Sequence, residues 1–402
     1  MTAKKIPVLL LSFMFLFAAG CEKDEPFDYT GGGGSNYNID SLTDAEKLKN
    51  IYAGKFEIGN IVNQTYMTGN HFKYLTTHYN TVTCENDMKP SNLAPSSGSY
   101  TFSTADAQVD AMRAAGLRVH GHTLVWHMQT PSWLTTGNAS VVQANMESYI
   151  TDVMNHFKGK VTSWDVVNEA MKDQGLSNYQ DQIMNQGKWK EYLRNTTDSD
   201  GNAASPWFQS LGANYIYAAF KKARAVDPDA VLYYNDYGLN GTYKPRAVYN
   251  MIKEINEDWA RDSAYDNRKL IEGIGMQGHY NVSWMNTDAG FDRLKGNIEK
   301  FLELGIRVDI SELDIAVGSD EEGTDRHSTM TDADATAQAQ AYAKLFRTLI
   351  ELDALHPNQI TRVTMWGIDD KNSWKSKGNP CLFDGNLKPK KAYYAVVDPD
   401  SY

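Results

Sequence analysis

Residues 291–316 read FDRLKGNIEKFLELGIRVDISELDIA. Apolar residues in the first half recur at the spacing of one helix face; they are Phe291, Leu294, Ile298, Phe301 and Leu302. Gly305 then stands where many helices end in a left-handed residue. The apolar, β-branched run 306–315 that follows indicates a buried strand, so the stretch predicts one helix–strand unit of an α/β fold.

The same joint of helix end, glycine and strand start recurs at 115–119, and strand patterns alternate with longer helical patterns along the chain. The predicted strands are 56–62, 81–85, 118–125, 162–167, 231–235, 274–279, 307–313 and 363–368. Eight strand–helix units in one domain predict an α/β fold of the (β/α)8 TIM barrel type. The alternative is a doubly wound sheet with a glycine-rich phosphate loop after its first strand, but residues 58–63 read IGNIVN.

The N-terminus has the features of an export signal. Lys4 and Lys5 precede the apolar run 8–19, which is too short to span a bilayer. Small residues lead directly to Cys21, as in the lipobox of bacterial lipoproteins, so we expect this cysteine to carry lipid. The charged run EKDE at 22–25, in which three residues are acidic, resembles the tag of surface-exposed Bacteroidetes lipoproteins, although a plain solvated linker is the alternative. The predicted location is therefore the outer membrane, with contact to lipid only through this anchor.

The predicted domain organisation follows from this reading. A signal peptide occupies 1–20, and a flexible tether containing GGGGS at 31–35 occupies 21–38. One folded domain covers 39–402, and we expect it to be monomeric. Beyond the lipidated cysteine only Cys84 and Cys381 remain; their spacing cannot decide whether they pair, and we favour two buried thiols.

The charge balance excludes one class of partner. The chain has 39 Lys and Arg against 50 Asp and Glu, which gives a net charge of −11. No basic stretch interrupts this acidic background, so a phosphate backbone would be repelled and no nucleic-acid role is expected.

Carboxylates stand at the ends of two predicted strands. The fourth strand ends in Asn168 and Glu169. On the seventh, Glu312 and Asp314 alternate with the same parity as 308 and 310, and we expect this face to line the barrel interior. A buried charge costs several kcal/mol unless it is paired or functional. These residues are therefore candidates for chemistry at the C-terminal mouth of the barrel.

Candidate partners for these carboxylates lie on neighbouring strands. Gln277 and His279 are two residues apart on the sixth strand and face one side; a neutral His279 would hold Glu312 ionised and be oriented by Asp314.

The third strand supplies His120, His122 and His127. A zinc site is the alternative here, but only the first two histidines share strand parity, and a sugar contact is the better reading of His122.

Two carboxylic acids across a cleft, surrounded by amides, imidazoles and indoles, are typical of glycoside hydrolysis. The motifs in this region are TCENDMK at 83–89, GHTLVWHMQTPSW at 121–133, WDVVNEA at 164–170, YNDY at 234–237, MQGH at 276–279, SELD at 311–314 and WGIDDKNSW at 366–374. In this order they resemble the successive motifs of glycoside hydrolase family 10, the retaining endo-β-1,4-xylanases. The resemblance covers residues 42 to about 396.

This resemblance implies a set of roles and no metal or cofactor. Glu169 corresponds to the acid/base and Glu312 to the nucleophile, with His279 and Asp314 in support. The residues implied to bind xylan and xylo-oligosaccharides are Glu85, Asn86, Lys89, His122, Trp126, Gln129, Asn168, Asn235, Tyr237, Gln277, Trp366 and Trp374. The alternatives are a β-1,4-glucanase or decorated-xylan hydrolase on the same barrel, and a glycan-binding lipoprotein with an inactive site.

Some positions depart from the family pattern near the substrate. Cys84, Pro90 and Met128 stand where the family often has Ala, Trp and Ser. The stretch 171–206 after the acid/base strand is longer than the common family loop. A lid or an added contact for branched substrate is the alternative, but such insertions are most often tolerated surface.

Overall fold

The computed structural model describes residues 37–173, 187–197, 203–318 and 330–402, which belong to one compact unit. The predicted signal peptide, Cys21 and most of the predicted tether lie outside the described residues. Within the described ranges, no helix combines the length and the apolar character needed to cross a membrane.

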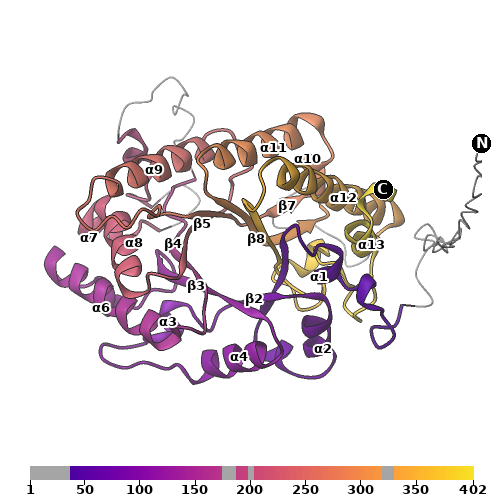
Figure 1. Cartoon of the computed structure of the whole chain (residues 1–402), viewed down its shortest axis with the longest axis horizontal. Helices are drawn as coiled ribbons and strands as arrows, with labels where there is room; N and C mark the ends of the chain where they lie inside the picture. Colours follow the sequence, from indigo (N-terminus) through magenta and orange to yellow (C-terminus); the bar gives the residue numbers. More distant parts are fainter. Residues whose placement is uncertain (1–36, 174–186, 198–202, 319–329) are drawn as a thin grey trace, which may run out of the picture. The chain divides into compact units, whose positions relative to one another are not determined.

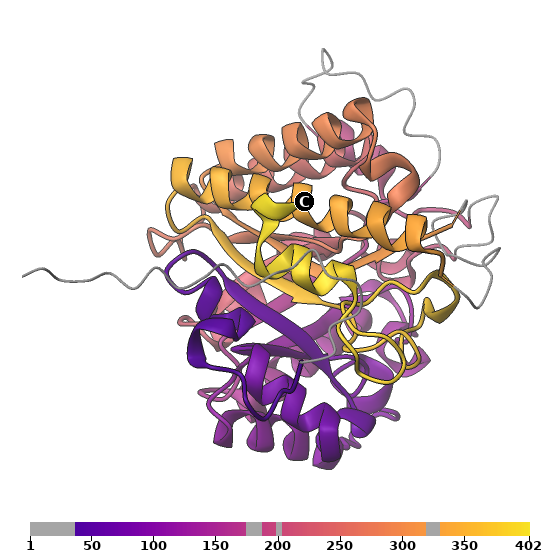
Figure 2. The ribbon, with the colours of Figure 1, turned by 90° about the vertical axis from the view of Figure 1, so that its right-hand side faces the viewer.

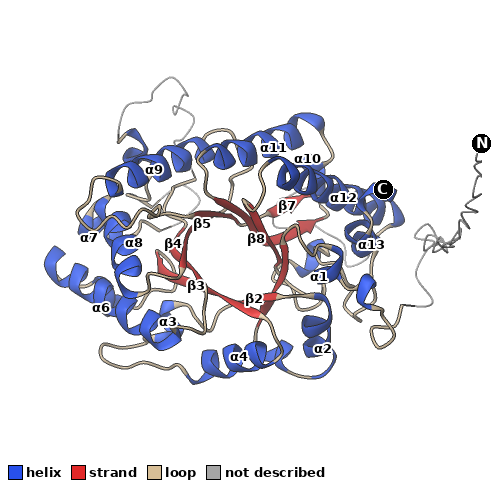
Figure 3. Ribbon diagram, in the orientation of Figure 1, coloured by secondary structure: helices blue, strands red, loops and turns tan. Residues whose placement is uncertain are grey.

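Parallel strands close into a ring, with the helices outside it (Figure 1; Figure 3). The strands are β1 (Glu57–Val62), β2 (Thr81–Cys84), β3 (Arg118–Trp126), β4 (Ser163–Asn168), β5 (Val231–Asp236), β6 (Gly273–Met276), β7 (His279–Asn281), β8 (Arg307–Ala316) and β9 (Ile360–Met365). Among the described strands, pairing runs from β6 through β5, β4, β3, β2, β1 and β9 to β8, and β8 pairs back to β6. This closure confirms the predicted (β/α)8 barrel.

The helices of the described residues are α1 (Leu48–Ile51), α2 (Gly69–His78), α3 (Pro90–Leu93), α4 (Ser103–Ala114), α5 (Ser132–Thr135), α6 (Ala139–Phe157), α7 (Pro206–Leu211), α8 (Asn214–Val226), α9 (Lys244–Trp259), α10 (Val282–Met285), α11 (Asp288–Glu303), α12 (Asp332–Leu355) and α13 (Lys391–Val397). Short 3₁₀ turns occur at Asp44–Glu46, Gln64–Met67, Lys188–Tyr192, Ser376–Gly378 and Pro399–Ser401. The C-terminal helix α13 packs beside α12 on the outside of the barrel (Figure 2).

The predicted helix–strand unit at 291–316 is confirmed in detail. Helix α11 begins after Thr287, whose hydroxyl accepts a hydrogen bond from the Gly290 N–H at 3.2 Å. All five predicted apolar residues of this helix are buried. The helix ends before Gly305, which has φ +62°, and β8 starts two residues later.

The ends of six predicted strands differ from the structure by one to three residues, and the other two predicted strands differ more clearly. The predicted strand 274–279 is divided into β6 and β7 by Gly278, which has φ +85°. A Cβ at this position would lie 2.6 Å from Cγ2 of Ile310, so the close approach of β8 requires glycine. The predicted strand 363–368 runs instead over β9, since Gly367 at φ +142° turns the chain directly after Trp366.

The predicted inward face of β8 is wrong for its first half. Asp309 and Ser311 point into the barrel: Asp309 pairs with Arg362, and the Ser311 hydroxyl donates to Oδ1 of Asn235 at 2.6 Å. By alternation Val308 and Ile310 face outward into the apolar core. The pairing of β8 with β9 shifts register between residues 310 and 313, and this irregularity brings Glu312 to the site despite its parity.

The hydrophobic core lies between the ring and the surrounding helices, whereas the ring interior is largely polar. Cys84 and Cys381 are both buried free thiols, in agreement with the preferred reading of the sequence.

Candidate active site

The backbone of Glu169 is held in an unusual conformation at the C-terminal end of β4. Its φ is +54°, in the left-handed region that costs a non-glycine residue about 1–3 kcal/mol. Three hydrogen bonds fix it: its N–H donates to the Asn235 carbonyl at 2.9 Å, its carbonyl accepts from Nε of Arg194 at 2.9 Å, and the next N–H donates to the Tyr234 hydroxyl at 3.0 Å. The carboxyl group is thereby directed into the mouth of the barrel.

Neutral donors hold the Glu169 side chain. Nε1 of Trp126 donates to Oε2 at 2.7 Å, and Nε2 of Gln277 donates to Oε1 at 2.9 Å. Burial raises the pKa of Glu169, and the negative charges of Asp236 and Glu312 raise it further. These effects outweigh the two hydrogen bonds, so the carboxyl group keeps its proton to a higher pH than a free glutamate does.

Glu312 has the opposite electrostatic environment. Burial alone would raise its pKa, but the hydrogen bond from His279 at 3.3 Å and the positive charge of the neighbouring imidazoles outweigh burial. Nδ2 of Asn235 adds a donor to Oε1 at 2.8 Å. The pKa of Glu312 is therefore lowered, and at a pH between the two pKa values this carboxylate is ionised while Glu169 is protonated.

The surroundings of His279 favour its protonated form over the neutral imidazole expected from the sequence. Burial would lower its pKa, but the Asp314 carboxylate, 2.8 Å from Nδ1, outweighs burial and raises the pKa to about 9. Nε1 of Trp374 also donates to Asp314, at 2.9 Å. The imidazolium thus lies between two carboxylates and stabilises the ionised form of Glu312.

Both glutamates line a cleft of about 750 Å³. Its lining contains Glu85, Asn86, Lys89, His122, Trp126, Asn168, Glu169, Tyr237, Gln277, His279, Glu312, Trp366 and Trp374, all of them predicted. Lys89 donates to Oδ1 of Asn86 at 2.9 Å, and its Nζ lies 5.2 Å from the ring centroid of Trp126. The Trp374 side chain is 58% exposed, so its face is available to a ligand.

This geometry suits the hydrolysis of a glycosidic bond, which needs one protonated and one ionised carboxyl group in the same cleft. The sequence model of Glycosyl hydrolase family 10 matches residues 47–399. The chain belongs to this family.

Relatives within family 10 resemble the chain over most of its length. The "Beta-1,4-xylanase" of Dictyoglomus thermophilum is 34% identical, over 87% of this chain and 90% of that protein. The "Endo-1,4-beta-xylanase B" of Paenibacillus barcinonensis is 31% identical, over 89% of this chain and 99% of that protein.

Solved family 10 structures match at the level of the fold. A xylanase from termite gut that contains a bacterial Ig-like domain superposes with a TM-score of 0.77, at 35% identity, over 92% of this chain and 79% of that chain. An intracellular xylanase of Thermoanaerobacterium saccharolyticum, solved as a mutant with xylotriose, gives 0.72 at 30% identity, over 89% of this chain and 99% of that one.

Three predicted site residues of this family 10 chain do not line the cleft. Asn235 has no exposed surface and acts on Glu312 and Asn168 through its amide. Asp314 is likewise buried behind His279. Gln129 is exposed, and its carbonyl accepts from the N–H of Ser91 at 2.8 Å. These positions support neighbouring groups rather than facing the cavity.

Sequence reasoning missed several cleft residues and assigned others no role. The cleft also contains His127, Met128, Asp173, Gly238, Asn240 and Lys375. Asp173 follows Glu169 by four residues, so its proximity to the acid/base strand was the available signal. Arg194 gave no signal, because it lies inside the stretch interpreted as tolerated surface; the structure buries it against Glu169.

The histidines considered as zinc ligands have another partner. Nε2 of His120 lies 3.1 Å from Oδ1 of Asp165, and Nδ1 of His122 lies 2.9 Å from its Oδ2. Asp165 therefore fixes the orientation of His122 toward the cleft. Across the four described ranges, no group of three or more His, Cys, Asp or Glu side chains is arranged to hold a metal ion.

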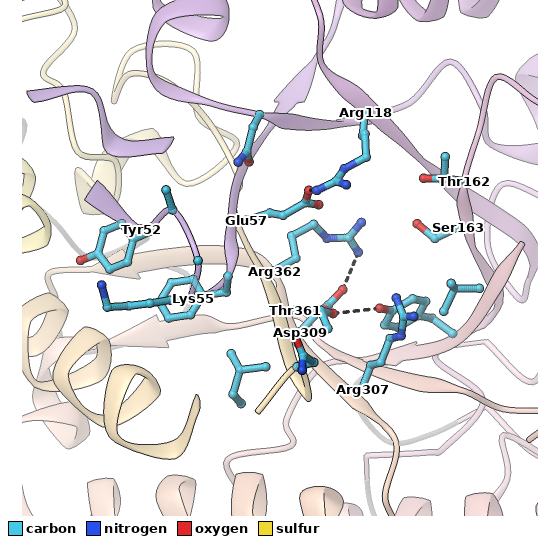
Figure 4. Close-up of a pocket in the computed structure, with 18 residues that line it drawn as sticks. Tyr52, Lys55, Glu57, Arg118, Thr162, Ser163, Arg307, Asp309, Thr361 and Arg362 are labelled. Carbon is cyan, nitrogen blue, oxygen red and sulfur yellow. Dashed lines mark hydrogen bonds and ion pairs between the residues drawn. The ribbon is translucent and has the colours of Figure 1, made fainter. Parts of the chain in front are cut away.

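A second polar cavity, of about 600 Å³, lies at the opposite end of the barrel (Figure 4). First residues of several strands line it. Its carboxylates are already paired: Asp309 lies 2.9 Å from Nη2 of Arg362, and Glu57 forms an ion pair with Arg118. Because these pairs neutralise one another, the cavity offers no carboxyl group suited to proton transfer.

Proposed function

We propose that this protein is an endo-1,4-β-xylanase that cleaves internal bonds of xylan with retention of the anomeric configuration. Glu169 is the general acid/base and Glu312 the nucleophile. The observation that carries the proposal is the pair of glutamates in one cleft whose pKa values are displaced in opposite directions. Membership of family 10 and the xylanases among its relatives support the substrate class.

The first step forms a glycosyl–enzyme ester. The Glu312 carboxylate attacks the anomeric carbon while the Glu169 carboxyl group gives its proton to the glycosidic oxygen, so the leaving chain departs as an alcohol. The new ester removes the negative charge of Glu312, which had raised the pKa of Glu169.

The second step releases the sugar. Ionised Glu169 accepts a proton from water as the oxygen of that water attacks the anomeric carbon, and the ester bond to Glu312 breaks. Two inversions give net retention, and both glutamates return to their starting protonation states.

The walls of the cleft support a five-carbon sugar. Trp366 lies edge-on to His122, with ring centroids 5.7 Å apart, and Trp374 lies 4.8 Å from the ring centroid of His279. Indoles held this close to the catalytic groups leave little room for the exocyclic CH₂OH that glucose has and xylose lacks.

A reducing-sugar assay on xylan, cellulose, barley β-glucan and mannan tests this function, with Glu312→Gln as the matched blank. We expect new reducing ends from xylan, with a fall in viscosity that marks internal cleavage. Release from the glucans but not from xylan would favour the glucanase alternative. Binding of xylan without any release would favour the glycan-binding alternative.

We also propose that the protein is exported and anchored by lipid on Cys21. The basic start, the short apolar run and the small residues before this cysteine support the proposal. Labelling with a fatty-acid analogue in a bacterial host should mark the full-length protein but not the Cys21→Ser variant. A Cys21→Ser variant that is still labelled would contradict the proposed anchor. Light scattering of the domain 39–402 tests the expected monomer.

A further inference from the structure

One buried guanidinium links the acid/base to Tyr237, which by its resemblance to family 10 corresponds to an aromatic residue on the leaving-group side of the cleft. Arg194 is only 2% exposed. Its Nε donates to the carbonyl of Glu169 at 2.9 Å, and its Nη2 donates to Oδ2 of Asp173 at 3.1 Å and to the hydroxyl of Tyr237 at 2.6 Å. A single side chain thus contacts the catalytic backbone, a cleft carboxylate and the cleft aromatic ring.

The backbone fixes Arg194 in this position. Met171 and Leu193 form an antiparallel bridge directly after the acid/base. The N–H of Arg194 donates to the Ala170 carbonyl at 3.0 Å, and its carbonyl accepts from the N–H of Ser205 at 2.9 Å. The arginine is therefore held on both sides, and its guanidinium has a defined direction toward the mouth of the barrel.

Tyr237 is held on several sides. Its hydroxyl donates to Asp173, and Nζ of Lys244 lies 3.7 Å from its ring centroid. Lys244 also pairs with Asp173 at 3.0 Å and with Asp236 at 2.8 Å. Among the described residues, the carboxylates of Asp173 and Asp236 face the cations Arg194 and Lys244 around the ring, so these four charges balance and hold the ring at the cleft wall.

We propose that Arg194 is a positioning residue for the leaving-group half of the site, which holds the backbone of Glu169 and the ring of Tyr237 in one fixed relation. This inference rests on the proposed function. Only a planar guanidinium offers donors to the carbonyl, the carboxylate and the phenol together; an ammonium offers a single centre.

The chemical consequence is selective. Cleavage between two sugars needs the Glu169 proton at the glycosidic oxygen and a sugar seated against Tyr237, so a small displacement of either lowers the rate steeply. The dinitrophenolate of a dinitrophenyl xylobioside leaves without protonation. This substrate also places no sugar in that half of the cleft. Loss of Arg194 should therefore affect the two substrates very differently.

The test compares Arg194→Lys and Arg194→Met with unmodified enzyme on xylopentaose and on 2,4-dinitrophenyl xylobioside. Active sites are counted by titration with a 2-fluoro xylobioside, so misfolded material does not enter the rates. We expect kcat/KM per active site to fall about 30- to 100-fold on xylopentaose and less than about 3-fold on the aryl substrate, in both variants. Tyr237→Phe removes one of the three contacts and should affect KM for xylopentaose more than kcat.

The matched control is Arg224→Met, which removes another buried arginine bonded to backbone carbonyls and a carboxylate, outside the cleft. This control variant should leave the ratio of kcat/KM on xylopentaose to kcat/KM on the aryl xylobioside unchanged. Equal losses on both substrates in the Arg194 variants, as in any structural defect, would overturn the role of Arg194. An unmodified enzyme that cleaves the aryl xylobioside but no xylo-oligosaccharide would instead contradict the proposed function.

Discussion

The two ends of the barrel each hold a polar cavity with buried carboxylates, of about 750 Å³ at the C-terminal mouth and about 600 Å³ at the N-terminal one. At the N-terminal end Asp309 is paired with Arg362, an arginine that never loses its charge. At the C-terminal end Glu169 is held by neutral indole and amide donors. A carboxylate in a buried ion pair with arginine contributes to the structure, whereas Glu169, whose pKa is raised and whose donors are neutral, can change its protonation during a reaction.

The largest effect should come from Glu312→Gln at the C-terminal end. The nucleophile acts mainly in the transition state, so kcat on xylo-oligosaccharides should fall by at least about 10⁴-fold while their binding stays within about tenfold. Steady-state rates and calorimetric titration of xylotetraose measure the two quantities. If the affinity of Glu312→Gln for xylotetraose falls as much as its kcat, Glu312 acts in binding and not as the nucleophile.

Glu169→Ala should have a smaller and substrate-dependent effect. Removal of general acid catalysis lowers the rate by about 10²–10⁴-fold where the leaving group needs a proton, but much less for a dinitrophenol. Rates on xylopentaose and on the dinitrophenyl xylobioside, with azide added to rescue the second step, separate these cases. Equal loss on both substrates would place the acid elsewhere.

Asp309→Asn at the other end should act on stability and not on chemistry. It leaves the buried guanidinium of Arg362 without its carboxylate, and breaking a buried ion pair costs about 3–5 kcal/mol. Urea unfolding should show this loss, while kcat per titrated active site stays unchanged. A fall in kcat as large as that of Glu169→Ala would break the distinction between the two ends.

The smallest effect should appear in the pH profile of kcat/KM, whose two limbs are displaced from the pH at which a free glutamate titrates. Glu312 must be ionised, and its lowered pKa moves the acidic limb of kcat/KM below the usual value of a glutamate. Glu169 must be protonated, and its raised pKa moves the basic limb above that value. Activity is thus lost as pH falls through the first pKa and as it rises through the second. A basic limb that is unchanged in Gln277→Leu and Asp236→Asn would contradict the stated causes.

Local patterns were sufficient to predict much of this molecule. The periodicity of 291–302, Gly305 and the strand after it predicted α11 and β8, because helix amphipathicity and the glycine cap depend on neighbouring residues. The motif order brought most of the cleft together, since the carboxyl ends of parallel strands meet at one mouth.

Features that depend on contacts between strands could not be predicted in this way. Glu312 reaches the mouth of the barrel, although Asp309 and Ser311 have the inward parity, because of the register shift between β8 and β9, which one strand does not encode. The raised pKa of His279 depends on how far the Asp314 carboxylate, 2.8 Å away, outweighs burial, which the sequence does not specify. Arg194 reaches Glu169 only through the bridge between Met171 and Leu193, and the residues between them carry no periodic pattern.

The most direct test of the account is the stereochemistry of the first product, together with the site of covalent labelling. Proton NMR of xylopentaose hydrolysis should show the β-anomer first, before mutarotation. A 2-fluoro xylobioside with an activated leaving group should inactivate the enzyme and label the peptide that contains Glu312. First appearance of the α-anomer, or a label on any other residue, would contradict the assignment of Glu312 as nucleophile and Glu169 as acid/base.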